Sequence, residues 1–181
     1  MDIMISQVAE PAPLAEPGDG LSGEAFRDSA ARLAGGVGVA ACWDGAAPVG
    51  LLVSSIAVLS VEPPRVLFCV RKAARSHDAL FRADRCSLNL LAEGDRAEAE
   101  RFSTAARTHE RFSALDWRLE RQAAPSYRAA LACLSGLISH RMDAGTHTVF
   151  VLAADRAVVR DADPLVYFDR RFAGLRALAD S

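Results

Sequence analysis

The sequence predicts a mainly β fold of the α+β class, a small and mostly antiparallel barrel or sandwich with a few short helices. Short apolar runs rich in Val, Leu and Ile follow one another and end at Gly, Pro or Asp residues, which is typical of strands. Few helical segments separate these runs, and this favours antiparallel pairing over a parallel α/β sheet. The glycine-rich segment 35–38 leads into an apolar run and not into a helix, so it does not indicate a Rossmann fold.

Composition limits the classes of protein to consider. The chain has 181 residues, of which 51% are hydrophobic and 24% charged, as expected of one globular domain. Its formal net charge of -2 argues against a general nucleic-acid binder, which usually carries a basic excess. No apolar run reaches the length of about 18 residues that a membrane helix needs, and the N-terminus lacks the basic start of a secretory signal. We therefore expect neither nucleic acid nor membrane as a partner.

The four cysteines indicate reduced thiols. Cys42, Cys69, Cys86 and Cys133 lie far apart in the sequence and form no C-x-x-C pair, so neither a zinc site nor a disulfide framework is indicated. Each lies in or beside an apolar run, where cysteine behaves as a small hydrophobic residue. Reduced thiols predict a cytoplasmic location, and we expect no metal site.

The N-terminal part predicts a tail followed by a helix. Residues 1–21 are rich in proline and contain a Gly-Asp-Gly sequence, so we expect a flexible tail there and one folded domain over residues 22–181. Ser22 suits the N-cap of a helix in which Phe26, Ala30 and Leu33 recur on one face. Gly35 and Gly36 are expected to end this helix.

The rest of the domain alternates strands with two helical segments. Ser76 is a candidate cap for a helix over 77–83, and 95–103 is a charged amphipathic segment. The apolar runs predict strands at 37–42, 49–60, 65–70, 86–91, 131–141 and 147–159.

A hairpin over residues 48–76 combines hydroxyl groups with positive charge. Ser54 and Ser55 lie inside its first apolar run, and three cations, Arg71, Lys72 and Arg75, follow its second run. Taken alone, paired serines most often satisfy backbone groups, and three cations in a loop most often form a solvated face. The serines lack a G-x-S-x-G sequence, and the four histidines lack metal-ligand spacing. These features favour a site whose chemistry belongs to a bound cofactor.

These residues carry a resemblance to a known family. Residues 50–55 followed by 59–64 resemble the G-x-T-x-S-S … S-L-x-P-P signature of the flavin reductase-like family. Further matches follow in order over roughly residues 25–175: Phe26-Arg27, Arg75-Ser76, and the segments 86–91, 101–103, 111–117, 145–148 and 164–168.

The resemblance implies an antiparallel FMN-binding split β-barrel. It implies an NAD(P)H:flavin oxidoreductase that transfers hydride from NADH or NADPH to FMN or FAD. It also implies a homodimer that supplies reduced flavin to a separate oxygenase, as in two-component flavin monooxygenases. Near-continuous apolar residues over 49–59 and 147–154 independently favour a homodimer. Strands of this kind leave an apolar face on the outside of the barrel, and a second copy of the chain most commonly buries such a face.

The resemblance also assigns roles to single residues. His147 is expected to position the nicotinamide against the flavin, although a lone histidine after a turn is usually structural. Asn89 and Phe102 are expected to lie near the flavin, although a buried Asn usually satisfies a neighbouring loop and Phe102 has the spacing of a core residue. The remaining cofactor-binding candidates are Gly50, Leu51, Leu52, Ser54, Ser55, Cys69, Val70, Arg71, Lys72, Arg75 and Ser76.

Two departures from the family pattern leave other functions open. Leu52 stands where the family has Thr, and Thr146 stands where it has the Asp that precedes the histidine. These changes favour the alternative of a non-catalytic flavin- or haem-binding carrier or sensor. A relative of pyridoxamine-phosphate oxidase would share the barrel but has no motif support here.

Overall fold

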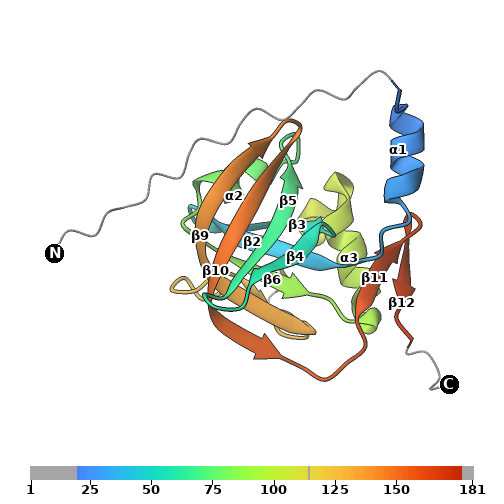
Figure 1. Ribbon diagram of the computed structural model, residues 1–181. Helices are drawn as coiled ribbons and strands as arrows, with labels where there is room; N and C mark the ends of the chain where they lie inside the picture. The colour runs from blue at the N-terminus through green and yellow to red at the C-terminus, as the bar shows by residue number, and fades with distance from the viewer. Residues whose placement is uncertain (1–19, 114, 177–181) are drawn as a thin grey trace.

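The computed structural model describes residues 20–113 and 115–176. Of the predicted tail, residues 1–19 lie outside these ranges. The described part is an antiparallel β structure with short helices (Figure 1), which confirms the predicted fold class. No described helix has the length and apolar character needed to cross a bilayer.

Seven strands form the main sheet, in the order β3-β2-β6-β9-β10-β5-β4. All neighbouring pairs in this sheet are antiparallel. The strands are β2 (Gly38–Asp44), β3 (Ala47–Val53), β4 (Ile56–Ser60), β5 (Arg65–Arg71), β6 (Arg85–Leu90), β9 (Ala132–Ala144) and β10 (His147–Val159).

The predicted strand over 49–60 is two strands. At Ser54 and Ser55 the chain passes from one edge of the sheet to the other. β3 pairs with β2 at the first edge, and β4 pairs with β5 at the second. The backbone of Ser55 still bonds to β5, because its carbonyl accepts from the amide of Cys69 at 3.2 Å. The two serines therefore bring together the two edges of the sheet, as needed to curl it into a barrel.

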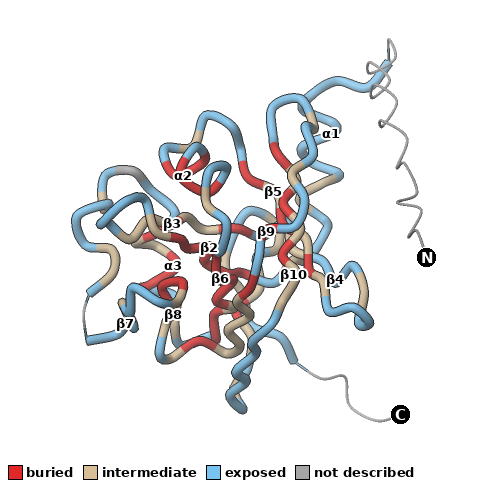
Figure 2. Tube along the Cα trace, turned by 90° about the vertical axis from the view of Figure 1, so that its left-hand side faces the viewer, coloured by how far each residue is buried: buried red, intermediate tan, exposed pale blue. Residues whose placement is uncertain are grey.

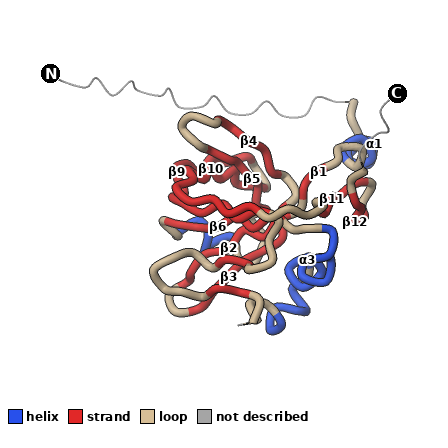
Figure 3. Tube along the Cα trace, turned by 90° about the horizontal axis from the view of Figure 1, so that it is seen from below, coloured by secondary structure: helices blue, strands red, loops and turns tan. Residues whose placement is uncertain are grey.

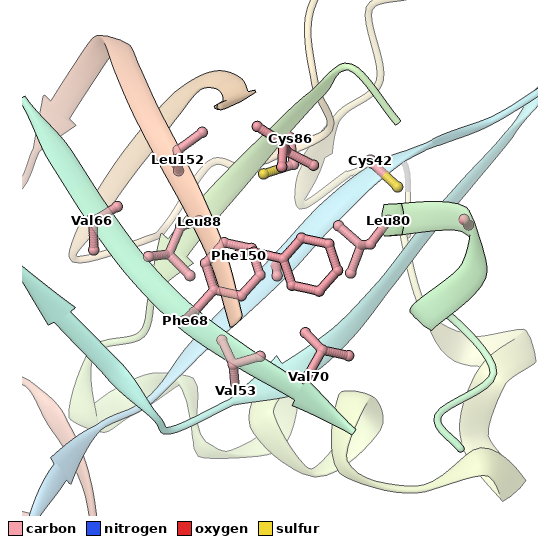
Figure 4. Close-up of a cluster of buried hydrophobic side chains, with 13 residues drawn as sticks. Cys42, Val53, Val66, Phe68, Val70, Leu80, Cys86, Leu88, Phe150 and Leu152 are labelled. Atoms are coloured by element: carbon pink, nitrogen blue, oxygen red, sulfur yellow. The ribbon is translucent and has the colours of Figure 1, made fainter. Parts of the chain in front are cut away.

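The interior of the curled sheet holds the larger core cluster. Phe68 on β5 and Phe150 on β10 stack with ring centroids 5.5 Å apart, and both are fully buried (Figure 4). Val66, Val70 and Leu152 on the same two strands share this interior. Every second residue of β5 and of the first half of β10 faces inward, and buried positions follow the central strands (Figure 2).

A second core cluster lies on the outer side of β2. Val39 and Ala41 pack there against Phe102 of α3 (Arg96–Ser103) and against Trp117. Trp117 donates to Glu98 on α3 at 2.8 Å, so the only polar group of this side chain is satisfied. α3 follows a 3₁₀ turn, η1 (Glu93–Asp95), and precedes a second one, η2 (Ala105–Glu110). The predicted helix over 95–103 is thus confirmed.

The remaining elements surround the barrel (Figure 3). α2 (His77–Arg82) covers one end of the interior through Leu80. β1 (Gly35–Gly36), β11 (Leu165–Phe168) and β12 (Arg171–Gly174) form a small separate sheet. β7 (Trp117–Arg118) pairs with β8 (Ser126–Tyr127).

The N-terminal helix, α1 (Gly23–Ala30), begins as predicted. Ser22 accepts a hydrogen bond from the amide of Ala25 at 3.1 Å, which is the N-cap interaction. The helix ends before Gly35 and Gly36, which form strand β1. Phe26 and Leu33, the expected apolar face, are 59% and 76% exposed.

Candidate functional site

A cleft of about 620 Å³ opens where Ser54 and Ser55, here called the serine crossing, meet the end of β5 and the C-terminal end of α3. Its volume lies within the roughly 300–1,000 Å³ of typical small-molecule sites. Most residues proposed from the sequence line it: Leu51, Leu52, Ser54, Ser55, Cys69, Val70, Arg71, Arg75, Ser76, Phe102 and His147. We call this hollow the flavin cleft, after the ligand that the sequence resemblance predicts for it.

The hydroxyl groups of Ser54 and Ser55 face the solvent side of the barrel wall. Both residues are exposed, and neither side chain has a hydrogen-bond partner within the described residues. They follow Leu51, Leu52 and Val53, which form an apolar wall of the same cleft. An apolar wall next to free hydroxyls suits a flat ring with polar edges.

Positive charge is concentrated at the other side of the cleft. Arg71 and Arg75 are exposed, and among the described residues neither makes an ion pair with a carboxylate. Arg111 also lines the cleft, and burial together with the nearby charge of Arg75 lowers the pKa of its guanidinium. Three arginines without a carboxylate partner favour an anionic ligand such as a phosphate.

Arg111 was not named as a site residue from the sequence, although the segment 111–117 carries a family match. Its guanidinium donates to the carbonyl oxygens of Gly50 (3.0 Å), Arg101 (3.0 Å) and Thr104 (2.6 Å). It therefore ties the end of α3 to β3. Because all these acceptors are neutral carbonyls, its positive charge is not neutralised by them.

Ser76 occupies the N-cap position of α2 but does not cap it through its side chain. Its hydroxyl instead donates to the carbonyl oxygen of Gly50 at 3.0 Å. This bond joins the loop 71–76 to β3, so the loop that carries Arg71 and Arg75 is held against the apolar wall. The predicted capping role of Ser76 is therefore wrong.

Gly50 positions the cleft without lining it. A Cβ atom at this residue would lie 2.9 Å from the carbonyl oxygen of Ala40 and 3.0 Å from the ring of Phe112. No side chain fits there without displacing these groups. Glycine is thus needed so that Phe102 and Phe112 can pack closely beneath β3.

Two other candidates lie outside the cleft. Lys72 forms an ion pair with Asp143 at 2.7 Å and does not line the cleft. Asn89 is fully buried: its amide donates to Val39 and Ser87, and its oxygen accepts from the backbone of Tyr127. These bonds give Asn89 a structural role, and we do not propose it as a cofactor contact.

His147 begins β10 at the edge of the cleft, directly opposite Arg71 of β5. Gly145, with φ of +69°, forms the turn that precedes it. The hydroxyl of Thr146 lies 2.9 Å from Nδ1 of His147. The residue that replaces the family Asp therefore still contacts the imidazole ring, and Nε2 has no partner in the described part of the chain.

A buried histidine links the two segments that carry the site. Nε2 of His77 lies 2.9 Å from the hydroxyl of Thr148, and Nδ1 lies 3.0 Å from Asp78. His77 directly follows Ser76, and Thr148 directly follows His147. This contact thus fixes the loop 71–76 relative to the start of β10.

The described residues contain no cluster of three or more His, Cys, Asp or Glu side chains that could hold a metal ion. The apolar wall, the hydroxyls and the arginines of the cleft suit the binding and orientation of a planar, anionic ligand.

Comparison with known proteins decides between the families that share this barrel. Residues 30–176 match the model of the flavin reductase like domain. The chain belongs to the flavin reductase-like family. The predicted family and the flavin reductase activity are thereby confirmed.

Individual flavin reductases agree with this assignment. The chain is 30% identical over 151 residues to the reductase subunit HsaB of a flavin-dependent monooxygenase from Rhodococcus jostii, covering 83% of this chain and 76% of HsaB. It is 32% identical over 149 residues to the FMN reductase (NADH) RutF 1 of Methylorubrum extorquens, covering 82% of this chain and 74% of that protein.

A solved flavin reductase has the same fold. The NADH:FAD oxidoreductase SgcE6 of Streptomyces globisporus, in complex with NAD and FAD fragments, superposes with a TM-score of 0.78 at 26% identity. The superposition covers 87% of this chain and 94% of that chain. Flavin and nicotinamide, the predicted cofactor and co-substrate, are thus the ligands of this family's members.

Proposed function

We propose that this flavin reductase uses NADH or NADPH to reduce FMN or FAD in the flavin cleft. When both are bound, the reduced nicotinamide supplies a hydride that the flavin accepts, and this chemistry belongs to the two cofactors. The protein has to bind and orient them, since close stacking is the main requirement. The cleft itself carries this proposal, because one hollow joins an apolar wall, free hydroxyls and unneutralised arginines.

The arginines and the loop amides suit the flavin phosphate. Arg75 and Ser76 lie in a loop whose backbone amides at these two residues bond to no acceptor within the described chain. Charge-assisted hydrogen bonds from guanidinium groups to phosphate are among the stronger ones in proteins. We assign the phosphate to Arg71, Arg75 and Ser76, with Arg111 as a further source of positive potential.

The opposite wall suits the ring. Leu51, Leu52 and Val70 exclude water from one side of the hollow, while Ser54 and Ser55 offer hydroxyls for polar ring atoms or for the polyol chain. We assign the nicotinamide to His147, whose Nε2 is available for a hydrogen bond. The hydroxyl of Thr146 holds the ring through Nδ1.

We propose that the chain is a homodimer. The outward-facing residues of β5 and β10 include Leu67, Cys69, Val149 and Val151, which are half-buried and apolar. Leu67 pairs with Val151, and Cys69 pairs with Val149, so the four form one patch. A second copy is the commonest cover for such a patch. Cys69 also lines the flavin cleft, so the partner would lie beside the bound flavin.

We further propose that reduced flavin passes to a separate oxygenase. HsaB is by name the reductase subunit of a monooxygenase, and the cleft of this chain is open to solvent on one side through Ser54 and Ser55. The four cysteines are free thiols, which is consistent with the proposed cytoplasmic location.

A direct assay tests this function. The purified protein is mixed anaerobically with FMN, FAD or riboflavin and with NADH or NADPH, and the loss of flavin absorbance is followed. Reduction with at least one pair supports the proposal. Binding of flavin without reduction by either nicotinamide would favour the carrier or sensor, which the departures at Leu52 and Thr146 otherwise suggest.

A further inference from the structure

The carbonyl oxygen of Gly50 joins three segments that surround the flavin cleft. It accepts one hydrogen bond from the hydroxyl of Ser76 and another from Nη1 of Arg111, each at 3.0 Å. A carbonyl oxygen has two lone pairs, so these two donors use both. Because Ser76 belongs to the loop 71–76 and Arg111 directly follows η2, β3 is fixed to both segments through one atom. We call this arrangement the Gly50 junction.

Arg111 is almost fully engaged at this junction. Its guanidinium also donates to the carbonyl oxygens of Arg101, Phe102 and Thr104, at 3.0, 3.3 and 2.6 Å. These carbonyls lie at the C-terminal end of α3, where a helix leaves carbonyl groups without an intrahelical partner and favours a cation. A guanidinium has five N–H groups, so the bonds to four carbonyls leave little donor capacity for a ligand.

The backbone next to Arg111 is strained. Phe112 has φ of +60°, a left-handed conformation that is rare for a bulky residue. Its ring packs against Phe102 and Trp117, with centroids 5.1 and 4.7 Å away, and a Cβ on Gly50 would lie 3.0 Å from it. Strained backbone persists where the surrounding structure fixes it, and it is common at functional sites. The packing of Phe112 thus fixes the direction in which Arg111 leaves the chain.

The junction sets the distance between the walls of the cleft. Leu51 and Leu52 follow Gly50 and form the apolar wall. Phe102, near the end of α3, and residues of the loop 71–76 line the cleft as well. A shift of β3 relative to either neighbour would therefore change the space for the flavin ring. Such placement matters, since a displacement of about 1 Å can cost two orders of magnitude in rate.

We propose that Arg111 is a positioning residue of the flavin cleft, which acts through the Gly50 junction and not as a ligand of the phosphate. This inference deepens the proposed function and rests on it, because the flavin is the ligand whose placement the junction controls. The positive potential of Arg111 reaches the cleft, but its N–H groups hold β3 and α3 together. A flavin without a phosphate should therefore depend on the geometry of Arg111 as much as one with a phosphate.

The test separates geometry from charge. Arg111→Lys keeps the positive charge, but an ammonium with three N–H groups cannot bond four carbonyls. Arg111→Gln removes the charge as well. Arg107→Gln is the control, because Arg107 lies in the same segment, pairs with Glu110 at 2.6 Å and does not line the cleft. The Kd of FMN and of riboflavin is measured for each variant, together with kcat for FMN reduction at saturating FMN and NADH or NADPH.

We expect Arg111→Lys to weaken riboflavin and FMN by the same factor, about threefold to tenfold, and to lower kcat. Arg111→Gln should weaken riboflavin as much as Arg111→Lys does. If Arg111→Lys behaves like the unaltered protein while Arg111→Gln weakens FMN alone, Arg111 is a phosphate ligand and the inference is overturned. It is also overturned if both variants lose stability in urea but keep both Kd values and kcat, because a residue that only supports the fold gives this result.

A double variant tests whether the two donors act through the same atom. Ser76→Ala removes the other donor to Gly50, and riboflavin, which has no phosphate, reports on the junction alone. The effects of Arg111→Lys and Ser76→Ala on the Kd of riboflavin should not multiply, since residues that share a partner are energetically coupled. Effects that multiply would show that the loop and α3 are held independently, which contradicts the junction.

A measurement on the unaltered protein keeps the inference testable if the variants fold poorly. The Nε–H signal of Arg111 in NMR spectra should exchange slowly with solvent even without flavin, because Nε donates to Arg101. Rapid exchange that FMN suppresses and riboflavin does not would make Arg111 a phosphate ligand and overturn the inference. Failure of the unaltered protein to bind or reduce flavin would instead count against the proposed function, and slow exchange in the flavin-free protein would still support the junction.

Discussion

His147 lies directly opposite Arg71 on the neighbouring strand, so the candidate nicotinamide ligand and a candidate phosphate ligand belong to one pair of the β5–β10 ladder. Residues opposite each other in an antiparallel pair have side chains on the same face. The serine crossing brings the apolar wall to the same hollow. The two reactants can therefore meet within one cleft.

Replacing His147 by Ala should affect the nicotinamide more than the flavin. One hydrogen bond contributes about 0.5–1.5 kcal/mol, so the KM for NADH or NADPH should rise by roughly threefold to tenfold. Flavin affinity, measured by fluorescence titration, should stay nearly constant. His140→Ala is the matched control, because His140 is exposed on β9 and does not line the flavin cleft. Loss of flavin with an unchanged nicotinamide KM would reassign His147 to the flavin.

Replacing Arg75 by Ala should weaken FMN more than riboflavin, because only FMN carries the phosphate. Loss of a charge-assisted bond of about 1.5–3 kcal/mol means a tenfold or larger increase in Kd. Lys72→Ala removes a charge from the same loop at a residue that pairs with Asp143 outside the cleft, and it should leave the ratio of the two Kd values near that of the unaltered protein. Equal weakening of both flavins by Arg75→Ala would place the phosphate elsewhere.

Replacing Thr148 by Val should destabilise the fold, because the buried Nε2 of His77 loses its partner. Leaving a buried polar group unsatisfied costs about 1–3 kcal/mol. Urea denaturation measures the change in the free energy of unfolding, with Thr104→Val at an exposed residue as the control. A cost no larger than that of the control would show that the His77–Thr148 contact does not hold the two segments together.

The apolar patch of Leu67, Cys69, Val149 and Val151 predicts a stable dimer. An obligate interface should bury more than about 2,000 Å² in total, and light scattering at micromolar concentration should give twice the mass of the chain. Val151→Glu should shift the protein toward monomer, whereas Asp155→Lys on the exposed end of β10 should not. A monomer that binds flavin with full affinity would contradict this prediction.

The fold class was predictable because the apolar runs of this chain are short and separated by clear turn residues. β10 was predicted over its full length, and β5 and β9 were placed to within a few residues. The break at Ser54 and Ser55 was missed, since apolar residues continue on both sides of it and periodicity within one strand does not show a change of sheet edge.

The lining of the flavin cleft was predictable where its residues are adjacent in the sequence, as in segments 51–55 and 69–76, while their roles toward a ligand stay predictions. Arg111 was missed because its role depends on the fold: it reaches the carbonyl of Gly50, far away in the chain. Asn89 was misplaced for the opposite reason. Its position in an apolar strand does not reveal that its hydrogen bonds go to Val39, Ser87 and Tyr127.

Anaerobic reduction of FMN at saturating NADH or NADPH, with the Arg75→Ala variant alongside, tests the central claim most directly. We predict that the unaltered protein reduces FMN and riboflavin, and that Arg75→Ala loses efficiency with FMN but retains it with riboflavin. Absence of flavin reduction by the unaltered protein with either nicotinamide, under conditions in which flavin binding is demonstrated, would contradict it.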